Sequence, residues 1–173
     1  MASTLKVNTI QHTGGTTAIS IDSAGRVTHP AKPAFRAEKR AGNQTLSDST
    51  TTAITFEHEA FDIGSNYDTS TSRFTAPVAG IYHFSSITRA VANSGTMDYF
   101  IMYLYKNGSL YSDMYQLQTS ANNMLNSNLG GSVTIQLAVD DYVEIRVQIS
   151  GTSPVVHAHA SGERTWFSGF LVG

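Results

Sequence analysis

Two histidines, His157 and His159, are the residues of this sequence best suited to bind a metal. Side chains alternate along an extended segment, so both imidazoles would project from the same face. If three copies of the chain met at an axis, six imidazoles could form an octahedral transition-metal site, for example for iron or nickel. The alternative, which we favour, is a metal-free pair on an exposed strand beside Ser161 and Gly162.

Acidic residues offer two further candidate sites, and both have simpler explanations. Asp140-Asp141 could form a carboxylate pair or bind calcium, but Asp is a preferred turn residue and a hairpin turn explains the pair better. His58-Glu59 begins like the helix of a zinc protease, yet Asp62 stands where the second His is required, and the surrounding residues favour a strand. The sequence also lacks a nucleophile elbow and a phosphate-binding loop. We therefore expect no enzymatic activity.

The composition limits the partners that this chain could have. Charged residues make up 14% of its 173 residues, the net charge is −2, and no run of Lys or Arg occurs, so we expect neither nucleic acid nor an anionic membrane surface as a partner. No apolar stretch reaches the roughly 18 residues that span a bilayer, so we expect no membrane insertion. Cysteine is absent, which excludes disulfides and thiolate metal sites.

Short runs with a period of two predict an all-β fold. The clearest hairpin covers residues 133–149, where apolar and polar side chains alternate on both sides of the turn at Asp140-Asp141. Asn107-Gly108 is an ideal two-residue hairpin turn. Further strands are predicted at 53–57, 73–76, 81–87, 99–105 and 165–172. No helical periodicity lasts longer than a turn or two, so the pattern predicts a sandwich or a barrel.

A break at residues 29–33 divides the chain in two. Pro30 and Pro33 remove backbone donors that a continuing sheet would need. Residues 1–32 contain so few large apolar side chains that burying them cannot offset the conformational entropy lost on ordering the segment. We therefore predict a docking or stalk segment at 1–32, ordered only when other chains complete its sheets, and a head domain at 33–173.

The head resembles the globular domains of complement subcomponent q and tumour necrosis factor. The similar residues, in order and spacing, are 33–37 (Pro-Ala-Phe-Arg-Ala), 67–84 with Arg-Phe-Thr-Ala-Pro and Gly-Ile-Tyr-His-Phe, 130–143 and 167–171. The resemblance implies a ten-strand jelly-roll sandwich that assembles as a compact homotrimer. Some heads of this family bind calcium near the trimer axis. The collagen-like repeats and cysteines of the animal proteins are absent here.

One predicted strand supports a trimer independently of the resemblance. Both faces of residues 99–105 are apolar or aromatic, whereas a strand of an isolated sandwich should have one solvated face. We therefore expect one face to pack in the core and the other against a neighbouring subunit, unless a long loop of the same chain covers it. The predicted trimer contacts are Tyr99, Ile101, Tyr103 and Tyr105.

The first thirty residues resemble the openings of phage tail-fibre and related virion proteins, particularly those of marine phages. The similarity lies in residues 3–11, 14–16 and 19–27. It implies a bacteriophage virion protein, made in the host cytoplasm and released by lysis, which agrees with the lack of a secretory signal pattern at the start of the sequence. The leading interpretation is a homotrimeric short tail fibre or adhesin, attached to other virion proteins through residues 1–32.

Two other functions stay open at this point. The chain could be a capsid decoration (cement) trimer that stabilises the shell, or a free lectin-like binding module of a bacterium. In an adhesin, polar loops of the head would bind a host cell-surface glycan or protein. The loops predicted to make that contact are residues 64–72, 91–96 and 120–128.

Overall fold

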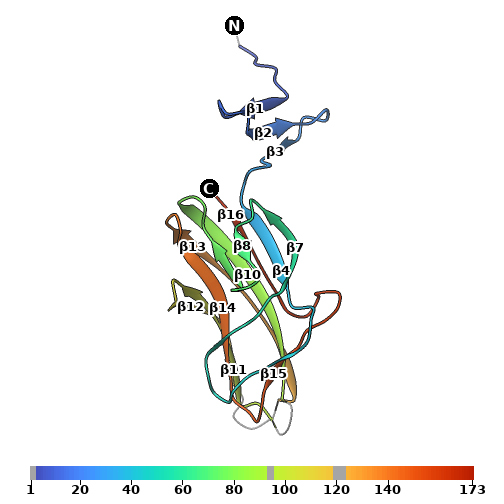
Figure 1. Ribbon diagram of the computed structural model, residues 1–173, viewed down its shortest axis with the longest axis vertical. Helices are drawn as coiled ribbons and strands as arrows, with labels where there is room; N and C mark the ends of the chain where they lie inside the picture. Colours follow the sequence, from blue (N-terminus) through green and yellow to red (C-terminus); the bar gives the residue numbers. More distant parts are fainter. Residues whose placement is uncertain (1–2, 93–95, 119–123) are drawn as a thin grey trace.

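The computed structural model describes residues 3–92, 96–118 and 124–173, and the regular elements of these residues are strands (Figure 1). This part of the chain holds no helix long and apolar enough to cross a membrane. The strands are β1 (Thr9–Gln11), β2 (Thr17–Ile21), β3 (Val27–Thr28), β4 (Ala34–Glu38), β5 (Gln44–Thr45), β6 (Thr52–Ala53), β7 (His58–Ile63), β8 (Tyr67–Asp68), β9 (Arg73–Thr75), β10 (Gly80–Val91), β11 (Tyr99–Lys106), β12 (Ser109–Gln118), β13 (Asn126–Leu137), β14 (Tyr142–Ile149), β15 (Val155–Val156) and β16 (Trp166–Leu171).

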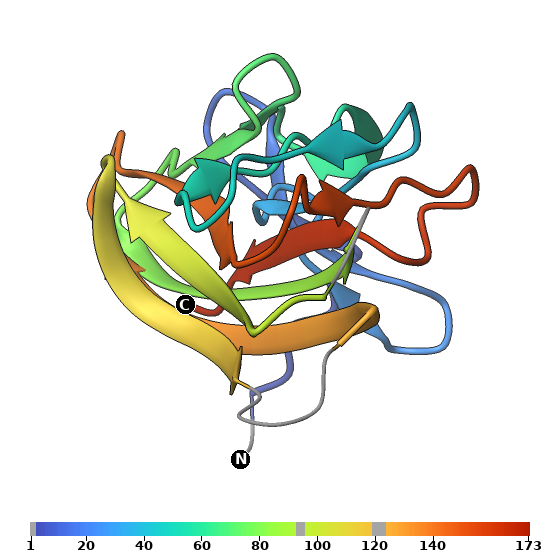
Figure 2. The same cartoon turned by 90° about the horizontal axis from the view of Figure 1, so that it is seen from below.

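The head consists of two antiparallel sheets packed face to face (Figures 1 and 2). The first, here the β10 sheet, has the order β5-β15-β10-β16-β4-β7, and β13 pairs with β10 along its whole length. The second, the β14 sheet, has the order β12-β11-β14-β9-β8, with β6 added beside β14. The last strand, β16, lies between β10 and β4. The predicted all-β jelly-roll sandwich is thereby confirmed.

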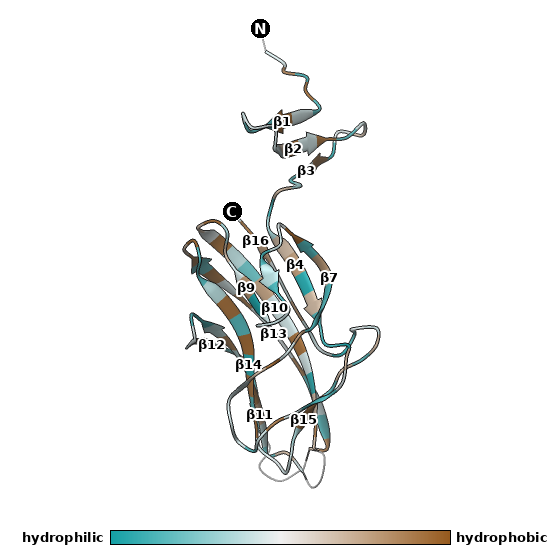
Figure 3. Cartoon of the chain, in the orientation of Figure 1, coloured by the Kyte–Doolittle hydropathy of each residue, from teal (hydrophilic) through white to brown (hydrophobic). Residues whose placement is uncertain are grey.

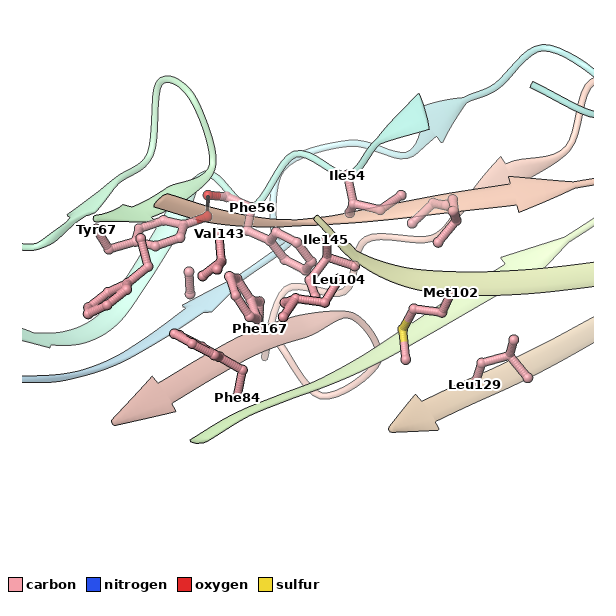
Figure 4. Packing of buried hydrophobic residues seen from close by; sticks show 14 of the residues in the cluster. Ile54, Phe56, Tyr67, Phe84, Met102, Leu104, Leu129, Val143, Ile145 and Phe167 are labelled. Atoms are coloured by element: carbon pink, nitrogen blue, oxygen red, sulfur yellow. Dashed lines mark hydrogen bonds between the residues drawn. The ribbon is translucent and has the colours of Figure 1, made fainter. Parts of the chain in front are cut away.

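Alternation along the strands fills the space between the sheets, and Figure 3 shows hydrophobic and hydrophilic residues alternating along them. In β11 the predicted core residues Phe100, Met102 and Leu104 are fully buried. The rings of Tyr67 and Phe74 both stack on Phe35, with centroids 4.9 Å away, as part of an aromatic cluster. Figure 4 shows this packing. The buried residues labelled there are Ile54, Phe56, Tyr67, Phe84, Met102, Leu104, Leu129, Val143, Ile145 and Phe167.

The predicted strand at 53–57 forms only in part. Ladder pairing ends with β6 at Ala53, although Ile54 and Phe56 are still buried in the core. The Ile54 amide donates to the Ile145 carbonyl at 3.0 Å, and the Phe56 amide donates to the Ser72 hydroxyl at 2.9 Å. The alternation of apolar residues therefore indicated burial correctly. At Phe56, however, the Ser72 hydroxyl accepts the amide hydrogen bond that a neighbouring strand would otherwise accept.

The N-terminal segment forms a separate three-stranded sheet, β1-β2-β3, at one end of the sandwich (Figure 1). Three of its larger apolar side chains stay in solvent: Leu5 exposes 81% of its surface, and Ile10 and Val27 are also exposed. Ile19 and Ile21 are half-buried. The link to the head runs through residues 29–33, where the Lys32 ammonium donates to the Val172 carbonyl at 2.7 Å. The docking role of residues 1–32 stays a prediction.

Candidate functional site

Exposed apolar side chains gather on the outer surface of the β10 sheet. Cross-strand registers place Ile63 beside Ala34, Ala34 beside Phe170, and Phe170 beside His83, so one row crosses four strands. Phe61 and Ile81 lie on the same surface, two residues from Ile63 and His83. Phe61 and Phe170 each expose 48% of their surface, and Ile63 and Ile81 are also exposed. We call Phe61, Ile63, Ile81 and Phe170 the apolar face.

Small residues occupy the middle of this surface. The next row runs from Ser132 through Ser85 and Ser168 to Arg36, and the two hydroxyls of Ser85 and Ser168 lie 3.1 Å apart. Gly130 follows on β13 in the row beyond. Exposed apolar patches such as the apolar face typically mark interaction sites.

A charge cluster borders the apolar face. Glu38 is almost fully buried on the outward side of β4 and accepts from Arg36 at 2.7 Å and from Arg40 at 2.6 Å. Burial raises the pKa of Glu38, but the hydrogen bonds from the two guanidiniums outweigh it and hold this pKa below its usual value. The Arg36 guanidinium also lies 4.5 Å above the ring of Trp166. The Glu38 charge is thus neutralised by two arginines, and these ion pairs fix the outward side of β4.

A second apolar patch lies on the opposite sheet, at its free edge. β12 is the edge strand of the β14 sheet and exposes Leu110, Tyr111 and Tyr115, here called the β12 edge. The backbones of β12 and β13 approach closely here, because a Cβ atom at Gly131 would lie 2.6 Å from the Met114 carbonyl oxygen. The two sheets therefore meet along this side, and the patch is rigidly placed.

The four predicted trimer contacts lie on the outer surface of the β14 sheet, and they are Tyr99, Ile101, Tyr103 and Tyr105. Their own sheet covers much of them. Tyr103 exposes only 9% of its surface and donates to the Gln148 side chain at 3.0 Å, while the Arg146 guanidinium lies 4.5 Å above the ring of Tyr105. Contact of these four residues with a neighbouring subunit stays a prediction. The more exposed apolar side chains lie on the apolar face and on the β12 edge.

The two candidate metal ligands have different surroundings. The His159 ring bonds to the Ser161 hydroxyl at 2.7 Å, whereas burial, together with the charges of Arg89 and Arg164, lowers the pKa of His157. The described residues contain no group of three His, Cys, Asp or Glu side chains that could hold a metal. A metal shared by three copies stays a prediction that metal analysis of the purified protein would test.

The structure shows a turn at Val139 and Asp140, one residue earlier than the predicted turn at Asp140-Asp141. Asp140 has a φ of 67°. The Asp141 carboxylate accepts hydrogen bonds from Lys106, Asn107 and the Ala138 amide. These bonds lower the pKa of Asp141 to about 2. This carboxylate closes two adjacent loops. His58 and Glu59, the zinc-protease-like pair, lie on strand β7.

Of the predicted contact loops, segment 64–72 is described and contains the strand β8. The segments 91–96 and 120–128 lie partly outside the described residues. Sequence reasoning missed the apolar face. A signal was present, since Phe61 and Ile63 alternate with Asp62, but the pattern does not reveal which sheet neighbours would leave them uncovered.

A family model described as "C1q domain" matches residues 34–172. The "Phage-like element PBSX protein XkdV" of Bacillus subtilis (strain 168) is 31% identical over 119 residues, which cover 66% of this chain and 17% of that protein. The mouse (Mus musculus) "Complement C1q tumor necrosis factor-related protein 3" is 30% identical over 120 residues, covering 69% of this chain and 44% of that protein. The chain thus spans less than half the length of either relative.

Solved structures share the fold at low sequence identity. The globular domain of zebrafish complement 1qA superposes with a TM-score of 0.57 at 17% identity, covering 82% of this chain and 98% of that one. The Eiger TNF of S. frugiperda gives a TM-score of 0.63 at 11% identity, covering 83% and 94%. Murine APRIL gives 0.55 at 13% identity, covering 82% and 99%.

Proposed function

Because this chain belongs to the C1q domain family, we propose that it is a homotrimeric structural protein of a bacteriophage particle that attaches the particle to its host. The apolar face carries this proposal, since it is an uncovered surface of the kind that self-association buries. Domains of the C1q and tumour necrosis factor type typically form homotrimers and act as binding or structural modules. The proposed role is therefore binding and not catalysis.

The position of the two apolar patches supports a closed ring of copies. The apolar face and the β12 edge belong to different sheets, so one patch of a protomer can pack on the other patch of the next protomer. Such a heterologous contact closes into a ring when the rotation between copies allows it. Stable assemblies of this type bury about 2,000 Å² or more, which would cover the exposed apolar side chains of both patches.

Two observations support the phage particle as the location. The sequence relationship to a protein of a phage-like element covers 66% of the chain. The separate sheet β1-β2-β3 exposes Ile10 and Val27, as expected of a segment that another chain covers. We propose that residues 1–32 bind other virion proteins and that the head projects outward as a short tail fibre or adhesin.

Attachment by such a head would rely on repeated weak contacts. Three linked copies can raise the apparent affinity by a factor of about 10²–10⁴ without any new contact. The end of the head away from residues 1–32 would face the host, because the N-terminal sheet lies at the opposite end (Figure 1). Reconstruction of a particle that carries the protein separates this role from capsid decoration, since the two place the trimer on different parts of the particle.

The substitution Phe170→Glu tests the assembly. It places a charge in the centre of the apolar face, so analytical ultracentrifugation at micromolar concentration should show three copies for the wild type and one for the variant. Val139→Asp is the matched control, because Val139 is also exposed but lies in the turn after β13. Circular dichroism melting verifies the fold of both variants. A wild-type monomer, or a Phe170→Glu trimer, would contradict the proposed assembly.

A further inference from the structure

Two guanidinium groups, those of Arg89 and Arg164, and the His157 imidazole lie together near one end of the β10 sheet. Arg89 lies next to the position where β10 pairs with Val156 of β15, and His157 follows that strand directly. Arg164 precedes β16 by two residues. Strand β15 lies at the end of the sandwich away from the N-terminal segment (Figure 1), so the cluster belongs to the end that we expect to face the host.

One buried hydroxyl holds the three segments in place. Thr165 is fully buried, and its hydroxyl accepts from the Arg89 amide at 3.2 Å and donates to the His157 carbonyl at 2.8 Å. The His157 amide in turn donates to the Arg89 carbonyl at 2.9 Å. Because Arg164 immediately precedes Thr165, the two arginines and His157 start from one hydrogen-bonded backbone frame. Such preorganisation is what a binding site needs.

No ion pair neutralises the cluster within the described residues, although Glu163 is the sequence neighbour of Arg164. Arg36 and Arg40 share Glu38, and Arg73 and Arg146 share Glu144, but no described carboxylate forms an ion pair with Arg89, His157 or Arg164. The Arg89 Nε atom is also buried without a hydrogen-bond partner. Burial and the two guanidinium charges lower the pKa of His157, which shows that the three groups interact unfavourably when charged. Like charges held together in this way are relieved by a bound anion.

We propose that Arg89, Arg164 and His157 bind an oxyanion, a carboxylate or a phosphate borne by a sugar of the host surface. The origin of the sugar rests on the proposed host attachment. Guanidinium groups donate two parallel N–H···O bonds to such an oxyanion, and the imidazole offers a third donor. The same charges oppose a metal cation at His157. In a trimer the site is present three times, so weak individual binding is sufficient.

The test uses the intact chain and four sugars. Galacturonate presents a carboxylate and glucose 6-phosphate a phosphate, while galactose and glucose are their neutral controls. Titrations followed by the His157 imidazole resonances in NMR should show binding of at least one charged sugar and none of its neutral counterpart. The variant Arg164→Gln should weaken that binding at least tenfold. Arg26→Gln, which removes an exposed arginine from the N-terminal segment, is the charge-matched control and should change it less than twofold.

Several results would overturn the site. They are the absence of binding by both charged sugars, equal binding of charged and neutral sugars, and unchanged binding by Arg164→Gln. Dissociation of the assembly in Arg164→Gln would also overturn it, because the cations would then face a neighbouring chain. If that variant does not fold, His157→Gln serves as the second variant, with binding followed by calorimetry. Adsorption of the intact protein to bacterial strains tests the proposed function separately: absent adsorption with normal sugar binding would reject host attachment and leave the oxyanion site in place.

Discussion

Each sheet holds one glutamate between two arginines, and both glutamates are almost fully buried. Glu144 accepts from Arg73 at 2.8 Å and from Arg146 at 2.6 Å, in the same way as Glu38 accepts from its two arginines. Three of the four guanidiniums lie over aromatic rings, for example Arg73 over Tyr142 at 4.3 Å. Each buried charge is thus hydrogen-bonded and neutralised, which is the condition under which a charge is tolerated in a protein interior.

Glu144 should make the head sensitive to acid. Burial raises the pKa of Glu144, but hydrogen bonds from Arg73 and Arg146 outweigh it and lower this pKa in the folded state. The resulting stabilisation is present above the unfolded pKa, near 4.5, and is lost as the pH falls through the lower folded value. We expect Glu144→Gln to reduce the free energy of unfolding by about 1–3 kcal/mol at pH 7, because hydrogen bonds to a charged group are lost.

Urea unfolding at a series of pH values measures this effect. The difference between the wild type and Glu144→Gln should narrow steadily as the pH drops below about 4.5, since protonation removes the same charge from the wild type. Glu163→Gln serves as the control, because Glu163 is exposed, and it should unfold like the wild type at pH 7. A difference that stays constant across the whole pH range would contradict the role assigned to the Glu144 charge.

Gly131 is required by the close approach of two strands. A methyl group there would meet the Met114 carbonyl oxygen at 2.6 Å, so β12 and β13 would have to move apart. We expect Gly131→Ala to destabilise the head by about 1–3 kcal/mol, the usual effect of overpacking. The neighbouring Gly130→Ala is the control, because its methyl meets the Ile87 side chain at 3.1 Å and lies 3.7 Å from the nearest backbone atom, the Ser86 carbonyl oxygen. Equal melting temperatures for the two variants would show that the strands can separate without cost.

For strand β11, the sequence predicted the buried side but not what covers the other side. Alternation along residues 99–105 was sufficient to place Phe100, Met102 and Leu104 in the core, because an alternating side-chain direction is a property of the strand itself. The cover of the other side of β11 was not predictable. It comes from Arg146 and Gln148 on β14, some forty residues away, whose long side chains lie across the tyrosines.

The same reasoning explains why the apolar face was missed. Its rows join β7, β4, β16 and β10, so adjacent positions come from residues 63, 34, 170 and 83. Single-strand patterns indicate which side chains share a side, and they do not indicate which strands are neighbours in the sheet. The oxyanion cluster was hidden for the same reason, since only the fold brings Arg89 and Arg164 to His157.

The N-terminal segment should be separable from the head. Removal of residues 1–32 deletes the sheet β1-β2-β3 and the Lys32 contact with the Val172 carbonyl, but no residue of the core. We expect the truncated head to melt within about 3 °C of the intact chain, because a change below 1 kcal/mol shifts the midpoint of such a domain by no more than a few degrees. It should also sediment as a trimer.

In phage particles, the same truncation should abolish incorporation while soluble protein accumulates normally. Mass spectrometry of purified particles measures this directly. Incorporation of the truncated head would mean that the head itself carries the attachment surface. A drop of more than 10 °C in the melting midpoint would instead make residues 1–32 part of the folding unit.

On the scale of the whole molecule, the structure separates three surfaces. The N-terminal sheet lies at one end, and β15, which borders the oxyanion cluster, lies towards the other (Figure 1). The third surface consists of the apolar face on the β10 sheet and the β12 edge on the β14 sheet. Assembly through the sides would leave both ends free. One end of each protomer could then attach to a particle while the other binds a sugar, without competition between the two contacts.

The first strand after the linker has a mechanical consequence. β4 begins one residue after Pro33 and is paired along its length with β16 on one side and β7 on the other. Tension between a particle and a captured cell would enter the head along this strand. Ladder hydrogen bonds run perpendicular to the strands, so both rows would be loaded in shear together and not opened one bond at a time. The head would therefore withstand drag forces while its sugar contacts release first and rebind.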